Sequence, residues 1–223
     1  MPRAILFDAA GTLIELGRPV GDSYASIAAE HGVVLPAWRL EDAFDRVLRQ
    51  MPTMCFPEAR PDEIPELERA WWRDLVRQTF LAADSTVAFA DFSGFFDALW
   101  TYFAAAASWR ARPDVPETLV TLRASGALLG VVSNFDHRLP NLLEDIGITR
   151  ELDCIVLPGT HRLAKPDPRV FGPALEALGA SASESVYVGD RAEIDGVAAA
   201  DAGLDFVDAS RLASLAELPR LLR

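Results

Sequence analysis

The chain has 223 residues, which suits one large domain or a core that carries a smaller insert. Half of the residues are hydrophobic, so a sizeable core can form and a disordered chain is excluded. The net charge of −12, from 33 acidic and 21 basic residues, argues against a nucleic-acid-binding surface. An enzyme this acidic needs a metal ion to supply local positive potential if its substrate is an anion.

The cysteine content and the hydropathy pattern indicate a cellular compartment. Cys55 and Cys154 lie in unrelated contexts without a CxxC motif, which excludes a disulfide framework or a zinc site and fits a reducing cytosol. The apolar run at residues 4–7 is too short for a signal peptide. No apolar stretch reaches the roughly 18 residues of a membrane span. We expect a soluble cytoplasmic protein, a monomer or homodimer, that binds neither nucleic acid nor a membrane.

The first half of the chain predicts one strand followed by helices. Residues 4–7 read as a short buried strand, and Gly11-Thr12 reads as a turn. From residue 17 to residue 107 a helical periodicity dominates, with Pro-rich breaks at 51–65. Four helices are predicted, over 22–31, 40–51, 66–82 and 91–107. Aromatic residues at helical spacing in these helices predict the core of a helical bundle.

The second half alternates between helices and strands. Helices are predicted over 117–125, 139–146, 170–178 and 195–202, and strands over 127–132, 152–157, 185–188 and 204–207. Strands separated by helices of this length predict a parallel, doubly wound sheet. The expected fold is therefore α/β, with a Rossmann-like core of residues 1–16 and 108–223. An α-helical cap domain, residues 17–107, is expected as an insert after the first strand.

Polar side chains follow the predicted strands at the points where the strands end. Asp8 ends the first strand, Ser133-Asn134 follows the second, Lys165 comes after the third, and Asp190 ends the fourth, with Asp195 five residues later. A single Asp after a strand commonly makes a turn or caps a helix. In a doubly wound sheet, however, the carboxyl ends of the strands form the ligand site. The conjunction therefore predicts carboxylates, a hydroxyl and an ammonium at one edge.

Lys165 carries further weight because it is the only lysine in the chain. The other 20 of the 21 basic residues are arginines. A surface lysine would be expected to be replaced by arginine as well. Its retention indicates that this position requires a compact ammonium group.

These motifs, in this order, resemble the four motifs of the haloacid dehalogenase-like superfamily. The motifs are Phe7-Asp8-Ala9-Ala10-Gly11-Thr12-Leu13, Ser133-Asn134, Lys165-Pro166-Asp167-Pro168 and Gly189-Asp190. The resemblance covers essentially the whole chain, including a helical cap after the first motif. Residues 71–80, 132–136 and 165–171 are most similar to a dehalogenase-like subgroup of that superfamily.

The resemblance implies a role for each motif residue. Asp8 would be a carboxylate nucleophile that forms an aspartyl intermediate. Mg²⁺, which prefers oxygen ligands, would bind Asp8, the backbone carbonyl of Ala10 and Asp190, while Asp195 orients metal-bound waters. Ser133 and Lys165 would hold the oxygens of the transferring group. The further residues expected to bind a small anionic substrate are Thr12, Asn134, Arg46 and Arg49.

The chain departs from the phosphatase pattern at Ala10. Phosphatases of the superfamily carry a second Asp there, as the general acid, and loss of such an acid typically costs about 10²–10⁴-fold in rate. Haloacid dehalogenases also lack this Asp. They differ from this chain, however, because they lack the Gly-Asp metal signature that it carries at residues 189–190. Phosphonoacetaldehyde hydrolases carry Ala at this position but need a cap lysine, and this chain has no lysine besides Lys165.

The preferred hypothesis is a Mg²⁺-dependent, phosphatase-type hydrolase that acts on a small phosphorylated metabolite. It would either use substrates with good leaving groups or take its acid from the cap, where His31, Arg46 and Arg49 are candidates. Two alternatives remain open at this point. One is a 2-haloacid dehalogenase-type hydrolase, and the other is a non-catalytic phospho-ligand or partner-binding protein with a vestigial site.

Overall fold

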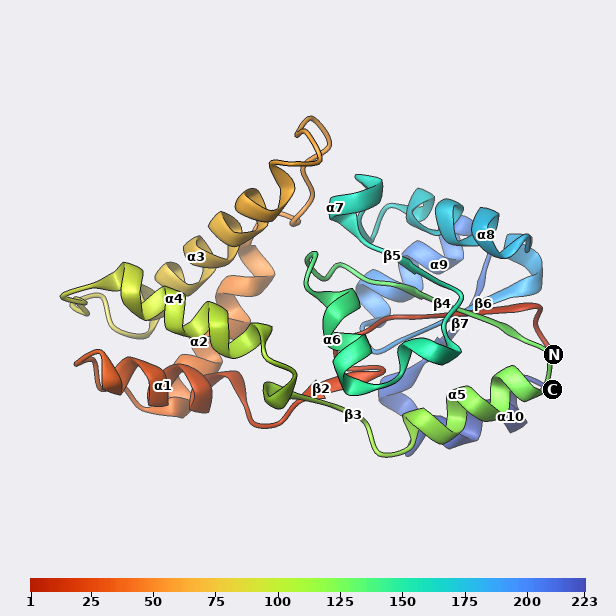
Figure 1. The fold of residues 1–223 in the computed structure, drawn as a ribbon, viewed down its shortest axis with the longest axis horizontal. Helices are drawn as coiled ribbons and strands as arrows, with labels where there is room; N and C mark the ends of the chain where they lie inside the picture. Colours follow the sequence, from red (N-terminus) through yellow and green to blue (C-terminus); the bar gives the residue numbers. More distant parts are fainter. The chain divides into compact units, whose positions relative to one another are not determined.

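The computed structural model describes all 223 residues, and the chain forms two compact units. The first unit contains Met1–Glu15, Met54–Asp62 and Arg110–Arg223, and the second contains Leu16–Thr53 and Glu63–Trp109. The short segment Met54–Asp62, which lies inside the predicted insert, thus belongs to the first unit. Figure 1 shows the elements of each unit.

The first unit is built on a five-stranded parallel sheet with the strand order β5-β4-β1-β6-β7. Its strands are β1 (Ala4–Phe7), β4 (Leu128–Val132), β5 (Cys154–Val156), β6 (Ser185–Gly189) and β7 (Asp205–Asp208). The predicted α/β class is confirmed. The bounds of β1 match the prediction, and the other strands begin and end within two residues of it.

The central strand β1 determines where a ligand can bind. Its four residues are apolar and fully buried, as expected for a strand that has a parallel neighbour on each side. Leu6 lies opposite Gly130 of β4 and Tyr187 of β6. The chain runs outward from β1 first on one side and then on the other, so the strand order reverses here. Ligand sites of doubly wound sheets lie at the carboxyl ends of the strands at such a reversal.

Helices cover both faces of the sheet (Figure 1). The helices α8 (Gly172–Leu178) and α9 (Val197–Ala202) pack with Leu6 and Tyr187 in one hydrophobic cluster. Figure 1 shows α5 (Val115–Ala124) and α10 (Leu218–Leu221) on the other side. The first unit also contains α6 (Leu139–Ile146) and the short α7 (Pro158–His161). Their apolar faces account for the helical periodicity of the sequence.

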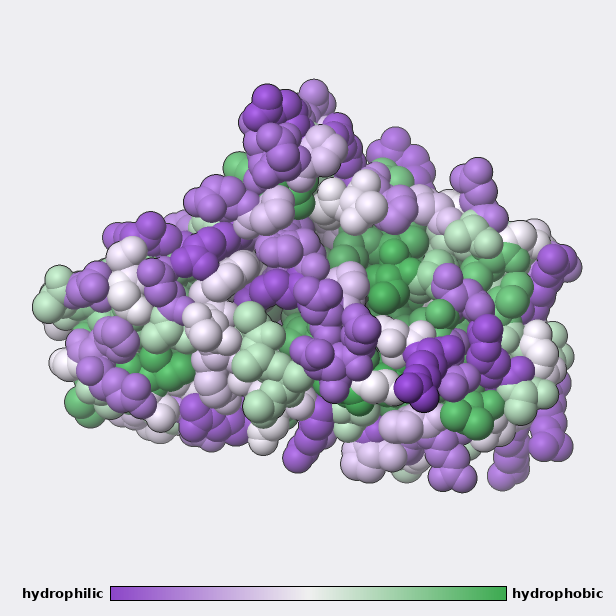
Figure 2. Space-filling model, in the orientation of Figure 1, coloured by the Kyte–Doolittle hydropathy of each residue, from purple (hydrophilic) through white to green (hydrophobic).

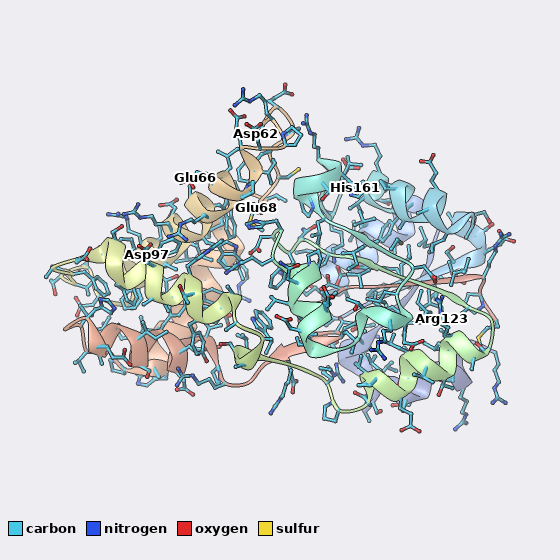
Figure 3. All side chains as sticks on the ribbon, viewed as in Figure 1. Asp62, Glu66, Glu68, Asp97, Arg123 and His161 are labelled. Carbon is cyan, nitrogen blue, oxygen red and sulfur yellow. The ribbon has the colours of Figure 1, made fainter.

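An ion pair fixes the start of two strands. Arg123, in the last turn of α5 (Figure 3), donates to Asp153 Oδ2 at 2.7 Å, and the same oxygen accepts the Leu129 N–H at 2.9 Å. The hydrogen bond from Arg123 holds the pKa of Asp153 below its usual range. The carboxylate therefore links α5, β4 and the segment that enters β5.

The second unit consists of four helices around an aromatic core. They are α1 (Val20–Glu30), α2 (Ala37–Gln50), α3 (Ile64–Ala83) and α4 (Phe92–Ala104). The Phe80 and Phe95 rings meet edge to face with their centroids 5.1 Å apart, and Tyr24 stacks on Phe80 at 5.9 Å. The aromatic stripe of the sequence thus forms a bundle core, as expected.

A two-stranded sheet was missed by the sequence analysis. The strands β2 (Ile14–Leu16) and β3 (Trp109–Ala111) pair with each other, and Arg110 Nε donates to Glu15 Oε1 at 2.8 Å beside them. Three-residue strands are too short to show the alternation by which strands are recognised.

The visible surface mixes hydrophilic and hydrophobic residues (Figure 2). Hydrophilic side chains gather on the loop that precedes α3, where Glu58, Arg60 and Asp62 are exposed. The most exposed large apolar side chains are those of Val34 and Trp38. No helix combines the length and the apolar character that crossing a membrane requires.

Candidate active site

The loop after β1 carries the first group of site residues. Asp8 continues the ladder through its N–H, which donates to Val188 O at 2.9 Å. The chain then turns sharply, because the N–H groups of three successive residues, 12–14, all point toward the carbonyl of Ala9. This turn brings the Thr12 hydroxyl to 3.3 Å from Asp190 Oδ1 at the end of β6. Two motifs that are far apart in the sequence therefore meet at the sheet edge.

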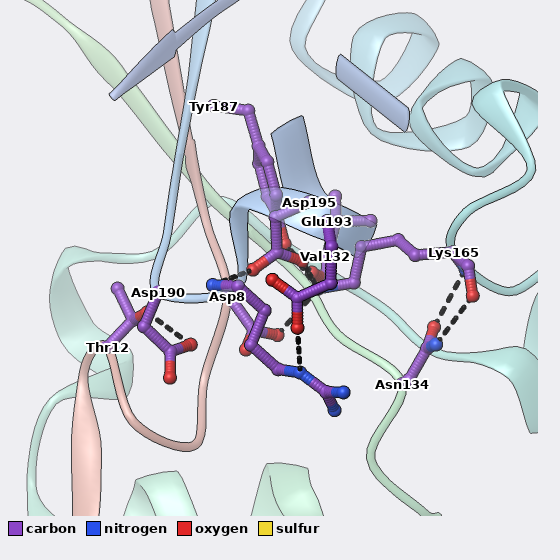
Figure 4. Close-up of polar contacts among 10 residues, drawn as sticks. Asp8, Thr12, Val132, Asn134, Lys165, Tyr187, Asp190, Glu193 and Asp195 are labelled. Atoms are coloured by element: carbon purple, nitrogen blue, oxygen red, sulfur yellow. Dashed lines mark hydrogen bonds and ion pairs between the residues drawn. The ribbon is translucent and has the colours of Figure 1, made fainter. Parts of the chain in front are cut away.

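Lys165 lies at the centre of a buried polar network (Figure 4). Its Nζ donates to Asp8 Oδ1 at 2.9 Å, to Asp195 Oδ1 at 2.7 Å and to the Tyr187 hydroxyl at 2.6 Å. The lysine side chain is only 3% exposed. An ammonium has three donors, so protein acceptors use every one of them. The expected contact of Lys165 with a substrate oxygen stays a prediction.

Asn134 holds the backbone of Lys165. Its Nδ2 donates to the Lys165 carbonyl and its Oδ1 accepts the Lys165 N–H, both at 2.8 Å. The Asn134 amide thus makes two hydrogen bonds with the backbone of Lys165, as the backbone of a neighbouring strand would. In this structure Asn134 positions the lysine, and its expected contact with substrate remains a prediction.

Three carboxylates converge around the single ammonium. One oxygen of each of Asp8, Asp190 and Asp195 lies within 4.8 Å of the others. Burial raises the pKa of Asp190, and the Asp8 carboxylate raises it further. Burial also raises the pKa of Asp195, although the nearby Lys165 opposes this shift. With one cation against three anions, the cluster carries excess negative charge that a divalent cation would compensate, and its oxygen donors suit Mg²⁺.

Two glycines permit this crowding. Gly11 has a φ of +86°, and a Cβ built on it would overlap the Asp190 carboxylate. A Cβ on Gly189 would likewise overlap the Asp195 carboxylate. The glycines beside Thr12 and Asp190 are therefore required by the close approach of the acids.

We expect Gly11→Ala to lower the stability of the fold. Gly32, with a φ of +80° and no atom within 4 Å of its Cβ position, provides the matched control. Gly32→Ala should cost only the backbone strain, about 1 kcal/mol. Gly11→Ala adds the collision with Asp190, so its urea-unfolding free energy should fall further. Equal losses in the two variants would contradict the role assigned to Gly11.

The remaining predicted residues occupy different surroundings. Ser133 is buried at the end of β4, where its N–H donates to Val156 O at 3.1 Å. Ala10 is partly exposed within the loop after β1. Arg46 and Arg49 are exposed on α2 in the second unit, and Arg46 pairs with Asp42 at 3.3 Å. The substrate-binding role of the two arginines stays a prediction.

Sequence reasoning missed Tyr187 and the turn that carries Asp195. Residues Ala192–Gly196 form a π-helical turn, and the Arg191 N–H donates to Asp195 Oδ2 at 3.1 Å. Such turns occur frequently at functional sites but have no clear sequence signature. For Tyr187 a signal existed, since a phenol in the middle of a buried strand needs a hydrogen-bond partner.

Comparisons with known proteins identify the family of this chain. A family model described as haloacid dehalogenase-like hydrolase matches residues 2–203. A protein of Mus musculus named haloacid dehalogenase-like hydrolase domain-containing protein 3 is 35% identical over 188 residues, which cover 84% of this chain and 74% of the mouse protein. The chain belongs to the haloacid dehalogenase-like hydrolase family, as its motifs predicted.

Two solved structures share the fold over nearly the whole chain. A protein described as a dehalogenase is 26% identical, with a TM-score of 0.69 and coverage of 99% of this chain and 96% of that chain. A phosphatase of the same superfamily from Thermococcus onnurineus is 21% identical, with a TM-score of 0.65 and coverage of 99% and 97%. The similar structures thus include both reaction types.

Proposed function

We propose that this protein is a Mg²⁺-dependent, phosphatase-type hydrolase with Asp8 as its nucleophile and a small phosphorylated metabolite as its substrate. The observation that carries the proposal is the cluster of Asp8, Asp190 and Asp195 around Lys165. Asp8 and Asp190, with the backbone carbonyl of Ala10, would hold the metal ion, and Asp195 would orient its water ligands. Bound Mg²⁺ would supply positive charge beside the phosphoryl oxygens.

The reaction would proceed in two displacements at phosphorus. Lys165 donates to Asp8 Oδ1 and so leaves Oδ2 for attack. Attack by Oδ2 forms an aspartyl phosphate as the bond between phosphorus and the alcohol oxygen breaks, and that oxygen leaves with the electron pair. Water then attacks the phosphorus, releases phosphate with loss of a proton to solvent, and restores the Asp8 carboxylate. Ala10 offers no proton to the leaving oxygen, so good leaving groups are preferred.

A 2-haloacid dehalogenase-type reaction is the second candidate. Two observations favour it, namely the methyl group at Ala10 and the 26% identity to a protein described as a dehalogenase. A halide leaves without a proton, so the absence of an acid would be no handicap. A dehalogenase would not need the carboxylate of Asp190 as a metal ligand. Because Asp190 is present beside Asp8, we prefer the phosphatase-type reaction.

A substrate panel separates these candidates. Phosphorylated metabolites and 2-haloacids are assayed with Mg²⁺ and with a chelator. The proposal expects Mg²⁺-dependent phosphate release and no halide release. Halide release that ignores the chelator would establish the second candidate, and no turnover in either class would indicate a vestigial site.

We expect Asp190→Ala to weaken Mg²⁺ binding by at least about tenfold, because it removes a negatively charged oxygen ligand. Isothermal calorimetry with Mg²⁺ measures the effect. Asp145→Ala, which removes an exposed carboxylate on α6, controls for general electrostatic attraction and should bind Mg²⁺ as wild type does. Unchanged affinity in Asp190→Ala would remove Asp190 from the metal site.

A further inference from the structure

The hydroxyl of Tyr187 connects the ammonium of Lys165 to the sheet. It accepts a hydrogen bond from Lys165 Nζ at 2.6 Å and donates one to the Val132 carbonyl at 2.7 Å (Figure 4). The tyrosine is fully buried, and the lysine nitrogen lies 5.1 Å from the centroid of its ring. None of the motif residues supplies this link.

The direction of these two hydrogen bonds is fixed. A backbone carbonyl only accepts, so the single proton of the phenol is used on Val132 and its lone pairs are left for Lys165. Burial raises the pKa of Tyr187 well above its ordinary value, and the negative charges of Asp8 and Asp195 raise it further. The hydroxyl therefore remains protonated and cannot act as the missing acid of the reaction.

The sheet register explains why a residue of β6 can reach the lysine. Tyr187 lies opposite Leu6, and side chains two residues apart on a strand point to the same face. Asp8 therefore follows Leu6 on the face that Tyr187 occupies. The phenol ring packs edge to face against Phe171, with centroids 4.8 Å apart, which holds it in place. The hydroxyl thus lies on a rigid part of the core beside the nucleophile.

We propose that Tyr187 is a positioning residue, which holds the Lys165 ammonium against Asp8 and thereby orients the nucleophilic carboxylate. The effect of Tyr187 on catalysis rests on the proposed function, whereas its effect on the position of the ammonium does not. The long lysine side chain has many rotamers, and its two carboxylate partners lie on different elements. Tyr187 supplies the third acceptor, and three acceptors around one ammonium determine its position.

The single lysine of the chain makes the test direct. In protein labelled with ¹⁵N-lysine, Lys165 gives the only lysine side-chain signal in the spectrum. Tyr187→Phe removes only the hydroxyl, and we expect the Nζ resonance to shift and ammonium proton exchange to accelerate about tenfold or more. Tyr102→Phe is the matched control in the second unit, since its hydroxyl accepts from Arg18 Nε at 3.0 Å. That variant should give the wild-type lysine signal.

Kinetics with nitrophenyl phosphate test the catalytic consequence. We expect Tyr187→Phe to lower kcat by about ten- to a hundredfold while KM changes by less than about twofold, because nucleophile orientation rather than substrate affinity is lost. Tyr102→Phe should keep both constants. An unchanged kcat in a variant with a shifted lysine signal would overturn the positioning role.

The remaining outcomes are also decisive. An unchanged lysine signal in folded Tyr187→Phe would overturn the proposal. If that variant did not fold, the test would use the wild type, in which nuclear Overhauser contacts between the Lys165 ammonium and the Tyr187 ring are expected. The absence of these contacts would overturn the proposal. If the wild type turned over no phosphate ester, the proposed function would fail. The lysine signal would then decide the placement of the ammonium by itself.

Discussion

Asp8→Asn is expected to abolish turnover of every substrate of the wild-type protein while the fold is kept. The amide has the shape of the carboxylate and can still accept from Lys165, but it is not a nucleophile. The substitution also removes one of three clustered negative charges, so the unfolding free energy should hold or rise. Activity on the best panel substrate and urea unfolding measure the two effects. Residual activity above a few per cent of wild type would exclude Asp8 as the nucleophile.

Asp153→Asn provides a control that should lose stability and keep turnover, whereas Asp8→Asn should lose turnover and keep stability. The Asp153 carboxylate accepts from Arg123 and from the backbone of Leu129, so the variant should lose on the order of 1 kcal/mol of stability at neutral pH and keep its turnover. Because Arg123 lowers the pKa of Asp153, the contribution is present above the ordinary carboxyl pKa of about 4 and is lost as the pH falls below it. The stability difference from wild type should therefore disappear in acid.

Ala10→Asp is expected to create a general acid. The backbone carbonyl of residue 10, rather than its side chain, is the proposed metal ligand, so the metal site should survive. An alkyl phosphate leaves as a strongly basic alkoxide, and its kcat/KM should rise by up to about 10²–10⁴-fold. A nitrophenyl phosphate leaves as a stable phenolate and should gain little. This dependence on the leaving group distinguishes a phosphatase that lacks only its acid from a dehalogenase or a binding protein.

Ala10→Asn is the matched control for that experiment. The amide has the size of the carboxyl group but cannot act as the acid, so neither substrate should gain. Equal gains for both substrates in Ala10→Asp would contradict the missing-acid explanation. So would no gain for either in a variant that still folds and binds Mg²⁺. A loss of substrate binding in both variants would show that the methyl group leaves space that the substrate needs.

Most of the sheet could be predicted because β1 and β4 are short, buried apolar runs and because strands alternate with helices along the second half of the chain. The run Ala4–Phe7, which ends at Asp8, gives the strand bounds directly. The helical turn at Ala192–Gly196 could not be predicted, since such turns have no clear sequence signature and the contact between the Arg191 N–H and Asp195 forms only on folding. The grouping of Met54–Asp62 with the first unit has no local signal either, because it depends on tertiary contacts.

The residues at the strand ends were predictable as members of the candidate site, but the network that they form was not. Strand ends identified Asp8, Lys165, Asp190 and Asp195, since parallel strands share one carboxyl edge. The pairing of Asn134 with the Lys165 backbone depends on two loops that meet only in three dimensions. Likewise, only the structure shows that all three donors of the Lys165 ammonium are engaged by protein acceptors.

The position of β1 has a consequence for how the protein is made. β1 is synthesised before the two strands that flank it, which begin only at Leu128 and Ser185. Until the residues of β4 have been synthesised, the apolar residues of β1 have no sheet to join, and nascent chains expose them to aggregation or to chaperones. Ribosome-bound chains that end before Ser185 would carry β1 with one edge unpaired, which is the kind of edge that recruits other strands. Asp8, the proposed nucleophile, is synthesised long before Lys165 and Asp195, so it acquires these neighbours only after both have emerged.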